Sequence, residues 1–454
     1  MLLEKIKSEG IAHNSYFVGS NNQAAVIDPR RDCDVYLDIA RARNMRITHI
    51  FETHRNEDYV IGSQELATLS GAEIYHGARL DFAYGRSAFE GDVFLIGDCE
   101  LTVLETPGHT EESLSIVVRE HPGGEPLLVF TGDALFAGDA GRTDFYGPDN
   151  RVHMSTLLYE SIVHKILPLG DGVIVCPAHG AGSVCGAAIA DREYTTIGYE
   201  KRVNTLLSMT KEEFIRTKAA EHHYYPPYFK KMEDLNRNGA PRLRHLPEPV
   251  AMPAAEIAQL LSEHVQVVDI RSPTAYAGAH IPGSIHLSRE ILPVYAGWLL
   301  GYDDPIVLID DDNHGLHGIV SALIRLGYDN VIGYLADGFA AWFKAGGPMD
   351  AVGLLSPAGA RERMRSGEPF LLDVRAVESW ERTGHIPGAR HIYLGDLPGG
   401  MGMIPEKADI IVYCDTGFKG SAAASLLKKA GHPNVWNLLG GMNAWLRENY
   451  PVEG

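Results

Sequence analysis

Three residues of metal-binding types stand where apolar runs of the chain end. His54 closes ITHIFETH, His109 lies in LTVLETPGHT and Asp133 closes LLVFTGD. An apolar run that ends in polar residues is typical of a buried strand that carries side chains to a site at its tip. Two imidazoles and one carboxylate form a facial triad, which leaves coordination positions open for water, oxygen or substrate. The pattern predicts a metal site, although iron and zinc both accept these ligands. The alternative is three loop residues hydrogen-bonded to backbone.

A cysteine offers a second kind of chemistry. Cys414 lies in VYCDTGFKGS, where an apolar strand meets the start of a helix. Loop amides, the helix N-terminus and the charge of Lys419 would stabilise a thiolate, a bound persulfide or a thiosulfate oxyanion there. Gly417 and Gly420 allow the loop to curl tightly. We therefore predict that Cys414 carries sulfur, with Lys419 beside it, rather than being a buried inert thiol.

The bulk composition bounds the kind of protein that holds these residues. The chain has 454 residues, which suggests roughly three domains, and its five cysteines are too few and too scattered for a disulfide framework. Its formal charge of −19 disfavours nucleic acid and anionic membrane surfaces as partners. The first residues do not form a signal peptide, and no apolar run is long enough to span a bilayer. We therefore expect a cytoplasmic protein.

The first 240 residues alternate short β-rich runs with polar loops. Besides the runs that end at His54, His109 and Asp133, AAVIDP and GVIVCPAHG also read as buried strands that end in polar residues. Residues 33–44 and 153–167 read as helices. A Pro-rich, mixed-charge stretch over residues 224–250 then predicts a domain boundary.

After this boundary the chain repeats itself. Residues 267–287 contain VVDIRSPTAYAGAHIPGSIHL, and residues 371–392 contain LLDVRAVESWERTGHIPGARHI. Asp269 matches Asp373 and Val331 matches Val435, and both offsets are 104 residues (373 − 269 and 435 − 331). Each unit alternates strands with helices, which predicts a small parallel α/β domain. We therefore predict domains over residues 1–245, 246–349 and 350–454.

The two repeats differ at the position that decides their chemistry. Subtracting the offset of 104 from Cys414 gives Asp310, within LIDDDNHG. A carboxylate cannot accept sulfane sulfur, and the three acidic residues Asp310, Asp311 and Asp312 would repel thiosulfate. We therefore predict that residues 246–349 are catalytically inactive and act as an interface or spacer. An inactive domain can survive as an interface, so a homo-oligomer stays open.

The motifs of the first 240 residues resemble the metallo-β-lactamase superfamily, which implies an αββα sandwich. The superfamily motif H-x-H-x-D-H, which serves two metals, here runs from His54 to Tyr59. Asn56 and Tyr59 take the places of its second and third histidines, which argues against a dinuclear zinc site. Asp58 and His179 would be only half of a second site.

Within that superfamily the chain resembles the persulfide dioxygenases, through GDAGRTDF at residues 138–145 and TTIGYEKRVN at residues 195–204. This resemblance implies one Fe(II) per chain, with Zn as the alternative, bound by the residues that match His54, His109 and Asp133. We expect further groups near the metal to fix water or substrate by hydrogen bonds, with a wall of satisfied polar residues as the alternative. Cys185 is either a persulfide acceptor or a packed small residue, and Arg142 with Asp144 is a substrate contact, a structural ion pair or both. The groups named for these outer roles are Asp58, Tyr59, Arg142, Asp144, His179 and Cys185.

Residues 350–454 resemble a rhodanese sulfurtransferase, through DVR at 373–375, GHIPGA at 384–389 and the Cys414 loop. The fold class is thus α/β multidomain, a metallo-β-lactamase sandwich followed by two rhodanese-type domains. Together the resemblances imply oxidation of a low-molecular-weight thiol persulfide by dioxygen to sulfite. Sulfane-sulfur transfer through Cys414 would make or use thiosulfate, in sulfide detoxification. The alternatives are a zinc thioester hydrolase like glyoxalase II, fused to a sulfurtransferase, and a non-catalytic persulfide-binding scaffold.

Overall fold

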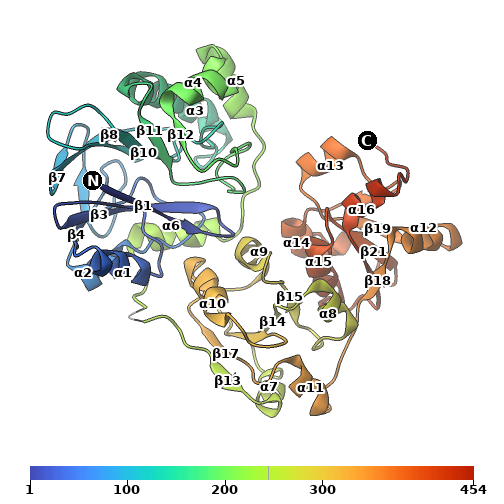
Figure 1. Ribbon diagram of the computed structural model, residues 1–454. Coiled ribbons are helices and arrows are strands. Elements are labelled where there is room, and N and C mark those ends of the chain that lie inside the picture. The colour runs from blue at the N-terminus through green and yellow to red at the C-terminus, as the bar shows by residue number, and fades with distance from the viewer. Residues whose placement is uncertain (244) are drawn as a thin grey trace. The chain divides into compact units, whose positions relative to one another are not determined.

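In the computed structural model, which describes residues 1–243 and 245–454, two six-stranded sheets form the N-terminal part. Met1–His245, with the short segment Ile324–Gly327, make one compact unit (Figure 1). The first sheet consists, in spatial order, of β1 (Leu2–Ser8), β2 (His13–Ser20), β3 (Gln23–Ile27), β4 (Arg46–Phe51), β5 (Glu73–Gly77) and β6 (Arg86–Ala88). The second consists, from one edge to the other, of β12 (Thr195–Thr196), β11 (Ile174–Pro177), β10 (Leu128–Gly132), β9 (Leu114–Arg119), β8 (Cys99–Glu105) and β7 (Val93–Ile96).

The main core of this unit lies between the two sheets. Val18, Ile27 and Phe51 of the first sheet belong to the same buried cluster as Leu101 and Phe130 of the second. A second cluster joins the first sheet to α1 (Asp34–Ala42) and α2 (Ser63–Ser70). A third joins the second sheet to α3 (Arg151–Ser161), α4 (Ile197–Val203) and α5 (Lys211–Ala220). Helices therefore cover both outer faces, and the expected αββα sandwich is confirmed.

The stretch that the sequence suggested as a boundary is partly ordered. Within residues 224–250 lies α6 (Phe229–Asn238), whose Phe229, Met232 and Asn236 are buried. Asn236 Nδ2 donates to the carbonyl oxygens of Asn56 and Tyr59, at 2.6 and 2.7 Å. The helix thus holds the loop that follows His54, and this part of the stretch belongs to the first unit rather than to a linker.

The second unit holds two five-stranded sheets with one common plan. The first sheet runs in the order β13 (Val250–Met252), β17 (Val331–Leu335), β16 (Ile306–Ile309), β14 (Gln266–Asp269) and β15 (Ile285–His286). The second runs in the order β18 (Gly353–Leu355), β22 (Asn434–Leu438), β21 (Asp409–Tyr413), β19 (Phe370–Asp373) and β20 (Arg390–His391). All neighbouring strands of these two sheets pair in parallel. The matching order confirms the duplication that the 104-residue offset predicted.

Helices pack around both of these sheets. The first repeat contains α7 (Ala254–Leu260), α8 (Pro273–Gly278), α9 (Leu292–Leu299), α10 (Leu316–Arg325) and α11 (Phe339–Lys344). The second contains α12 (Pro357–Ser366), α13 (Val377–Thr383), α14 (Leu397–Gly400), α15 (Phe418–Lys429) and α16 (Gly441–Arg447).

Side-chain contacts repeat along with the strands. Arg271 makes a two-pronged ion pair with Asp269, and Arg375 makes the same pair with Asp373. A histidine ring nitrogen meets the carbonyl oxygen of each arginine, at 2.9 Å in the first repeat and 2.8 Å in the second. Because buried ion pairs need such complete partners, these contacts belong to the shared fold and not to the chemistry of one repeat.

The two repeats also pack against each other through α15. The backbone N–H of His286, on β15, donates to Ser425 Oγ of α15 at 2.9 Å. Every residue from Gly420 to Leu427 of this helix is buried. A helix that is buried all round lies inside its domain, so the helix that follows Cys414 is a shared wall of both repeats.

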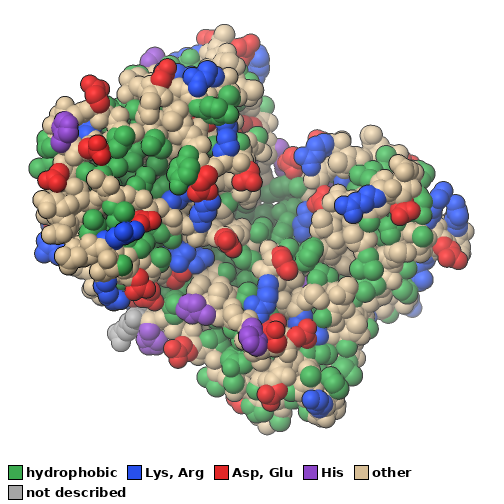
Figure 2. Space-filling view, viewed as in Figure 1, with side chains coloured by type: hydrophobic (Ala, Val, Ile, Leu, Met, Phe, Trp, Pro, Cys, Tyr) green, Lys and Arg blue, Asp and Glu red, His purple; other side chains and the backbone are tan. Residues whose placement is uncertain are grey.

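The surface view adds the distribution of charge. On the face that Figure 2 shows, acidic and basic side chains are interspersed among hydrophobic and neutral ones. In the part of the chain that the structure describes, a helix both long enough and apolar enough to cross a bilayer is not found.

Candidate metal centre and sulfur-carrying loop

The structure brings His54, His109 and Asp133 together. They follow β4, β8 and β10, and each is at most 1 % exposed. Asp133 Oδ2 lies 3.7 Å from Nε2 of His54 and 3.3 Å from Nε2 of His109. Strands from both sheets therefore deliver the three side chains to one buried point.

The far side of each imidazole is fixed by a hydrogen bond. His54 Nδ1 lies 2.9 Å from Thr53 Oγ1, whose hydroxyl donates to Asp28 at 2.7 Å. His109 Nδ1 lies 2.9 Å from the carbonyl oxygen of Arg142, which can only accept. Among the residues described, neither Nε2 atom has a hydrogen-bond partner. Both rings therefore present a nitrogen lone pair toward Asp133, as metal-binding histidines do.

Burial and charge set the protonation states of these groups. Burial lowers the pKa of His54 to about 3 and also lowers the pKa of His109. Burial alone would raise the pKa of Asp133, but the neighbouring imidazoles, that of His179 foremost, hold it below its usual value. Neutral imidazoles beside an ionised carboxylate are the forms that bind metal ions.

His179 lies between two carboxylates on the other side of Asp133. Its Nδ1 is 2.8 Å from Asp133 Oδ1, and its Nε2 is 2.9 Å from Asp58 Oδ2. Against the effect of burial, the two carboxylates raise its pKa well above the usual value. Ligand atoms of Asp58, His179 and Cys185 all lie within 4.8 Å of one another, as do those of His109, Asp133 and Cys185. The structure therefore places Cys185 beside the candidate metal site, with a thiol whose pKa burial raises.

Glu57 is a neighbour of the site that the sequence did not single out. Its side chain is fully buried, and Oε2 lies 4.0 Å from His109 Nε2. Ligand atoms of His54, Glu57 and His109 all lie within 4.8 Å of one another. The only sequence signal is a carboxylate inside the segment from His54 to Tyr59, at a position the motif leaves unspecified.

Arg142 and Asp144 form the ion pair that the sequence offered as one of two readings. Arg142 Nε and Nη2 donate to the two oxygens of Asp144, at 2.6 and 2.8 Å. Its Nη1 donates to the carbonyl oxygens of Val184 and Tyr224. Because the whole guanidinium is engaged in this way, the pair braces the loop whose backbone oxygen holds His109.

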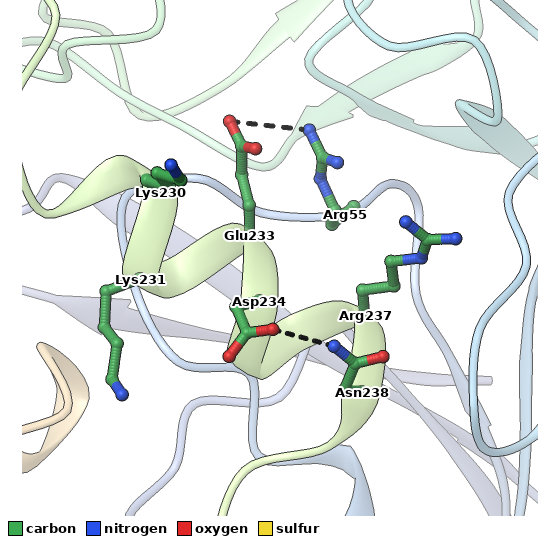
Figure 3. Close-up of a pocket in the computed structure, with 7 residues that line it drawn as sticks. All are labelled: Arg55, Lys230, Lys231, Glu233, Asp234, Arg237 and Asn238. Carbon is green, nitrogen blue, oxygen red and sulfur yellow. Dashed lines mark hydrogen bonds and ion pairs between the residues drawn. The ribbon is translucent and has the colours of Figure 1, made fainter.

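An open cavity of about 540 Å³ lies beside Arg55, on the surface of the same unit. Figure 3 shows Arg55 on the loop after His54 and Glu233 on α6, joined by a dashed line that marks a 3.7 Å ion pair. The lining residues are Arg55, Lys230, Lys231, Glu233, Asp234, Arg237 and Asn238. Since Arg55 also contacts Glu57, one side chain joins the wall of this cavity to the buried site.

The Cys414 loop has the geometry of an anion cradle. The backbone N–H groups of Gly417 and Gly420 point at Cys414 Sγ, at 3.1 and 3.3 Å. Gly417 has φ of 99°, a left-handed conformation that favours glycine. Lys419 Nζ lies 2.8 Å from Asp415, and the charges of Cys414 and Asp415 raise the pKa of Lys419 in spite of its burial. The loop therefore offers aligned donors and one nearby cation to a sulfur anion.

In the first repeat, the equivalent loop encloses its own carboxylate. Asp310 Oδ2 accepts hydrogen bonds from the Asn313 backbone N–H at 2.9 Å and from Arg289 at 2.6 Å. Asn313 matches Gly417 by the same offset of 104 (417 − 313). The amide that faces sulfur in one repeat thus faces a fixed negative charge in the other.

Comparisons with known proteins agree with this architecture. The metallo-beta-lactamase superfamily model matches residues 9–179, and the rhodanese-like domain model matches residues 253–345 and 356–448. A metallo-beta-lactamase structure from Staphylococcus aureus subsp. aureus COL is 30 % identical, with a TM-score of 0.65, covering 74 % of this chain and 99 % of that one. The chain belongs to the metallo-β-lactamase superfamily. It also carries two rhodanese-like domains.

Two curated relatives of this metallo-β-lactamase domain have different activities in their names. Hydroxyacylglutathione hydrolase GloC of Haemophilus influenzae is 30 % identical over 207 residues, which are 41 % of this chain and 87 % of that protein. The mitochondrial persulfide dioxygenase ETHE1 of Bos taurus is 27 % identical over 214 residues, 44 % of this chain and 74 % of that protein. The expected fusion of a metallo-β-lactamase domain with persulfide dioxygenase relatives and two rhodanese-like domains is thus confirmed.

The two departures from the metallo-β-lactamase motif lie close to the site. Asn56 Nδ2 donates to the carbonyl oxygen of His54 at 3.2 Å, whereas its Oδ1 has no hydrogen-bond partner among the described residues. The hydroxyl of Tyr59 also lacks one there, and its ring lies 4.0 Å from that of His13. These side chains form a polar wall, but its hydrogen bonds are incomplete. His13 is fully buried at the start of β2, and no sequence motif pointed to it as a residue near the site.

Proposed function

We propose that residues 1–245 oxidise a low-molecular-weight persulfide with dioxygen, using one Fe(II) held by His54, His109 and Asp133. The observation that carries this proposal is the pair of buried Nε2 atoms, without partners among the described residues, that face one carboxylate oxygen. Two ligand atoms on one ion stand roughly 3.0–4.2 Å apart when each bond is about 2.1 Å. The separations of 3.7 and 3.3 Å between these nitrogens and Asp133 Oδ2 suit such sharing.

The overall reaction is R–S–SH + O₂ + H₂O → R–SH + HSO₃⁻ + H⁺, in which the terminal sulfur is oxidised and dioxygen is reduced. When bound, ferrous iron would supply the unpaired electrons that let triplet dioxygen react with a singlet sulfur compound. The ETHE1 relative, named a persulfide dioxygenase, supports this choice over other oxidations.

The chain's own side chains would orient the reactants. Thr53 and the Arg142 carbonyl oxygen hold the two imidazoles, and His179 fixes Asp133 through Nδ1. The burial of the whole cluster limits access of bulk water. Cys185 lies near enough to His109 and Asp133 to contact a persulfide bound there.

We propose that residues 350–454 transfer sulfane sulfur. The Cys414 thiolate would attack the outer sulfur of thiosulfate, the S–S bond would break, and sulfite would leave with the electron pair. The reverse step would join sulfite to the sulfur on Cys414 and so make thiosulfate. The amides of Gly417 and Gly420 would stabilise the charged sulfur in both directions. Residues 246–349 would take no part in transfer, because Asp310 occupies the position of the nucleophile.

The direct test is metal quantification and oxygen uptake on the purified full chain. We expect about one iron per chain, uptake with at least one thiol persulfide, and loss of both in His109→Ala. Cys414→Ser should leave iron content and oxygen uptake unchanged but abolish sulfur transfer from thiosulfate. A protein that holds iron and takes up no oxygen with glutathione, coenzyme A or bacillithiol persulfides would contradict the proposal.

The second candidate is zinc-dependent thioester hydrolysis, which the 30 % identity to the GloC hydrolase favours. That chemistry uses a metal-bound hydroxide and no dioxygen. Hydrolysis of S-lactoylglutathione by the zinc-loaded protein, without oxygen uptake by the iron-loaded one, would select it. The replacement of the motif's histidines by Asn56 and Tyr59 is the observation against it.

A further inference from the structure

We infer that Glu57 binds the same metal ion as His54 and His109, so that the ion has two carboxylate ligands rather than one. This inference rests on the metal site proposed above and adds one residue to it. It assigns a role to a carboxylate that lies outside the histidine and aspartate positions of the family motif.

The first support is the environment of the side chain. Glu57 is fully buried, and Oε2 has no hydrogen-bond partner within the described part of the chain. That oxygen lies 4.0 Å from His109 Nε2, too far for a hydrogen bond but within the range for two ligands of one ion. An unpartnered carboxylate oxygen is costly to bury, and a divalent cation is the partner that two lone-pair nitrogens and this oxygen would share.

The second support is how the carboxylate is aimed. Arg55 Nη2 donates to Glu57 Oε1 at 2.9 Å, which leaves Oε2 as the oxygen that faces the histidines. Arg55 is itself held in place, because its backbone N–H donates to Glu112 and its guanidinium pairs with Glu233 of α6 (Figure 3). Glu57 Oε1 thus accepts a hydrogen bond from Arg55, and Oε2 faces the candidate metal site.

The charge of the site also fits a divalent ion. Two neutral imidazoles with the carboxylates of Glu57 and Asp133 carry a formal charge of about −2, which a divalent cation cancels. A six-coordinate ion with four protein ligands keeps two open positions, enough for one sulfur and one oxygen molecule. Asn56 stands where the motif has a ligand histidine, and Glu57 would supply the missing ligand from the next position.

The experiment compares Glu57→Gln with a matched control, Glu233→Gln. Both changes remove a carboxylate partner of Arg55, but only the first lies beside His109. The metal-free full chain is titrated anaerobically with Fe²⁺ and with Co²⁺ against a competing chelator, and the visible absorption of the Co²⁺ form is recorded. We expect binding about 100-fold weaker or more in Glu57→Gln, with stronger Co²⁺ bands as the coordination number falls. Glu233→Gln should match the wild type in both measurements.

The outcomes separate this inference from the proposal beneath it. Unchanged affinity and an unchanged Co²⁺ spectrum in Glu57→Gln, with binding lost in His109→Ala, would overturn the role of Glu57 alone. A wild-type chain that binds neither metal would overturn the metal site itself. Far-UV circular dichroism and the urea unfolding curve of each variant, compared with those of the wild type, report whether it has folded. If Glu57→Gln fails that check, Glu57→Asp serves instead, and a wild-type affinity and Co²⁺ spectrum in it would count against a ligand that must reach the ion.

Discussion

Asp310 accepts a hydrogen bond from the backbone N–H of Asn313 at 2.9 Å, and this is the link that Gly417 makes to Cys414 one repeat later. The loop of the first repeat therefore keeps the amide that would face a sulfur anion. Its own carboxylate satisfies that amide, and Arg289 neutralises the carboxylate from the other side. The carboxylate that stands in place of the cysteine therefore has two hydrogen-bond donors on one of its oxygens, a backbone amide and an arginine.

Restoring the cysteine alone should not restore sulfur transfer. In an Asp310→Cys, Cys414→Ser double variant, Asp311 and Asp312 would still repel thiosulfate, and Gly315 stands where Lys419 would supply a cation (419 − 104). Three charge effects of about 1 kcal/mol each predict a rate below roughly 1 % of wild type. The measurement is cyanide-dependent thiocyanate formation from thiosulfate. A rate above a tenth of wild type would show that the nucleophile was all the first repeat lacked.

For sulfur transfer from thiosulfate, the charge of Lys419 should matter more than the shape of its side chain. Lys419→Gln should lower kcat/KM for thiosulfate about 10-fold and flatten its dependence on salt, because a cation near the thiosulfate is lost. Lys419→Arg should keep most of the activity. The control is Lys428→Gln on the same helix, since Lys428 pairs with Asp350 instead. Equal loss in the glutamine and arginine variants would point to packing rather than charge.

The sequence predicted those candidate site residues that directly follow a strand. The apolar runs before His54, His109 and Asp133 become β4 of the first sheet and β8 and β10 of the second, and the residues that follow these strands meet at one edge of the sandwich. Cys414 could be recognised because its loop is a local pattern, and the duplication because residues 267–287 resemble residues 371–392 at an offset of 104 residues.

The remaining features depend on contacts between distant segments. Arg55 holds Glu57 Oε1 while Oε2 faces the histidines, and Arg55 is paired with Glu233, which is 178 residues further along the chain (233 − 55). That partner lies on a helix in a stretch whose prolines and mixed charges predicted a domain boundary. A contact between such distant segments leaves no local pattern in the sequence. Glu57, which lies between two positions of the family motif, was therefore not predicted as a site residue.

The brace around His109 should control metal affinity without touching the metal. Arg142→Lys removes the two-pronged pair with Asp144 and the bonds to Val184 and Tyr224, so the loop that carries the acceptor for His109 Nδ1 would loosen. Loss of such outer partners typically costs 10–100-fold in metal affinity, and we expect about 10-fold in a chelator competition.

The control for this brace is Arg151→Lys, because Arg151 lies 4.0 Å from Asp144 and is partly exposed. It should bind metal as the wild type does. A drop of the same size in both variants would mean that the two-pronged pair between Arg142 and Asp144 is not the contact that sets the affinity.

The tandem repeats should lose stability below neutral pH through His286. Burial lowers the pKa of His286 from 6.5 to about 4, so the folded state keeps the ring neutral while the unfolded chain binds a proton below pH 6.5. The stabilisation is complete above about pH 6.5 and declines as the pH falls toward 4, by roughly 3 kcal/mol at most.

Tryptophan fluorescence can follow this effect in the full chain, because all five tryptophans lie beyond residue 246. Urea unfolding of wild type and His286→Gln at pH 7 and pH 5 isolates the contribution of the ring from other titrating groups. We expect the difference in unfolding free energy between the two pH values to shrink in the variant. An identical difference in both proteins would rule out His286 as the source.

Because α15 is buried on every side, the stability of each repeat depends on the other. Ala422, Ala423 and Ala424 are small and fully enclosed, and Ser425 joins this helix to β15 of the preceding repeat. Deleting the first repeat would expose to water the face of α15 that packs against it. The helix that follows Cys414 would then lose part of its packing. The first repeat, which has Asp310 at the position of Cys414, therefore supplies part of the packing around the helix that follows Cys414.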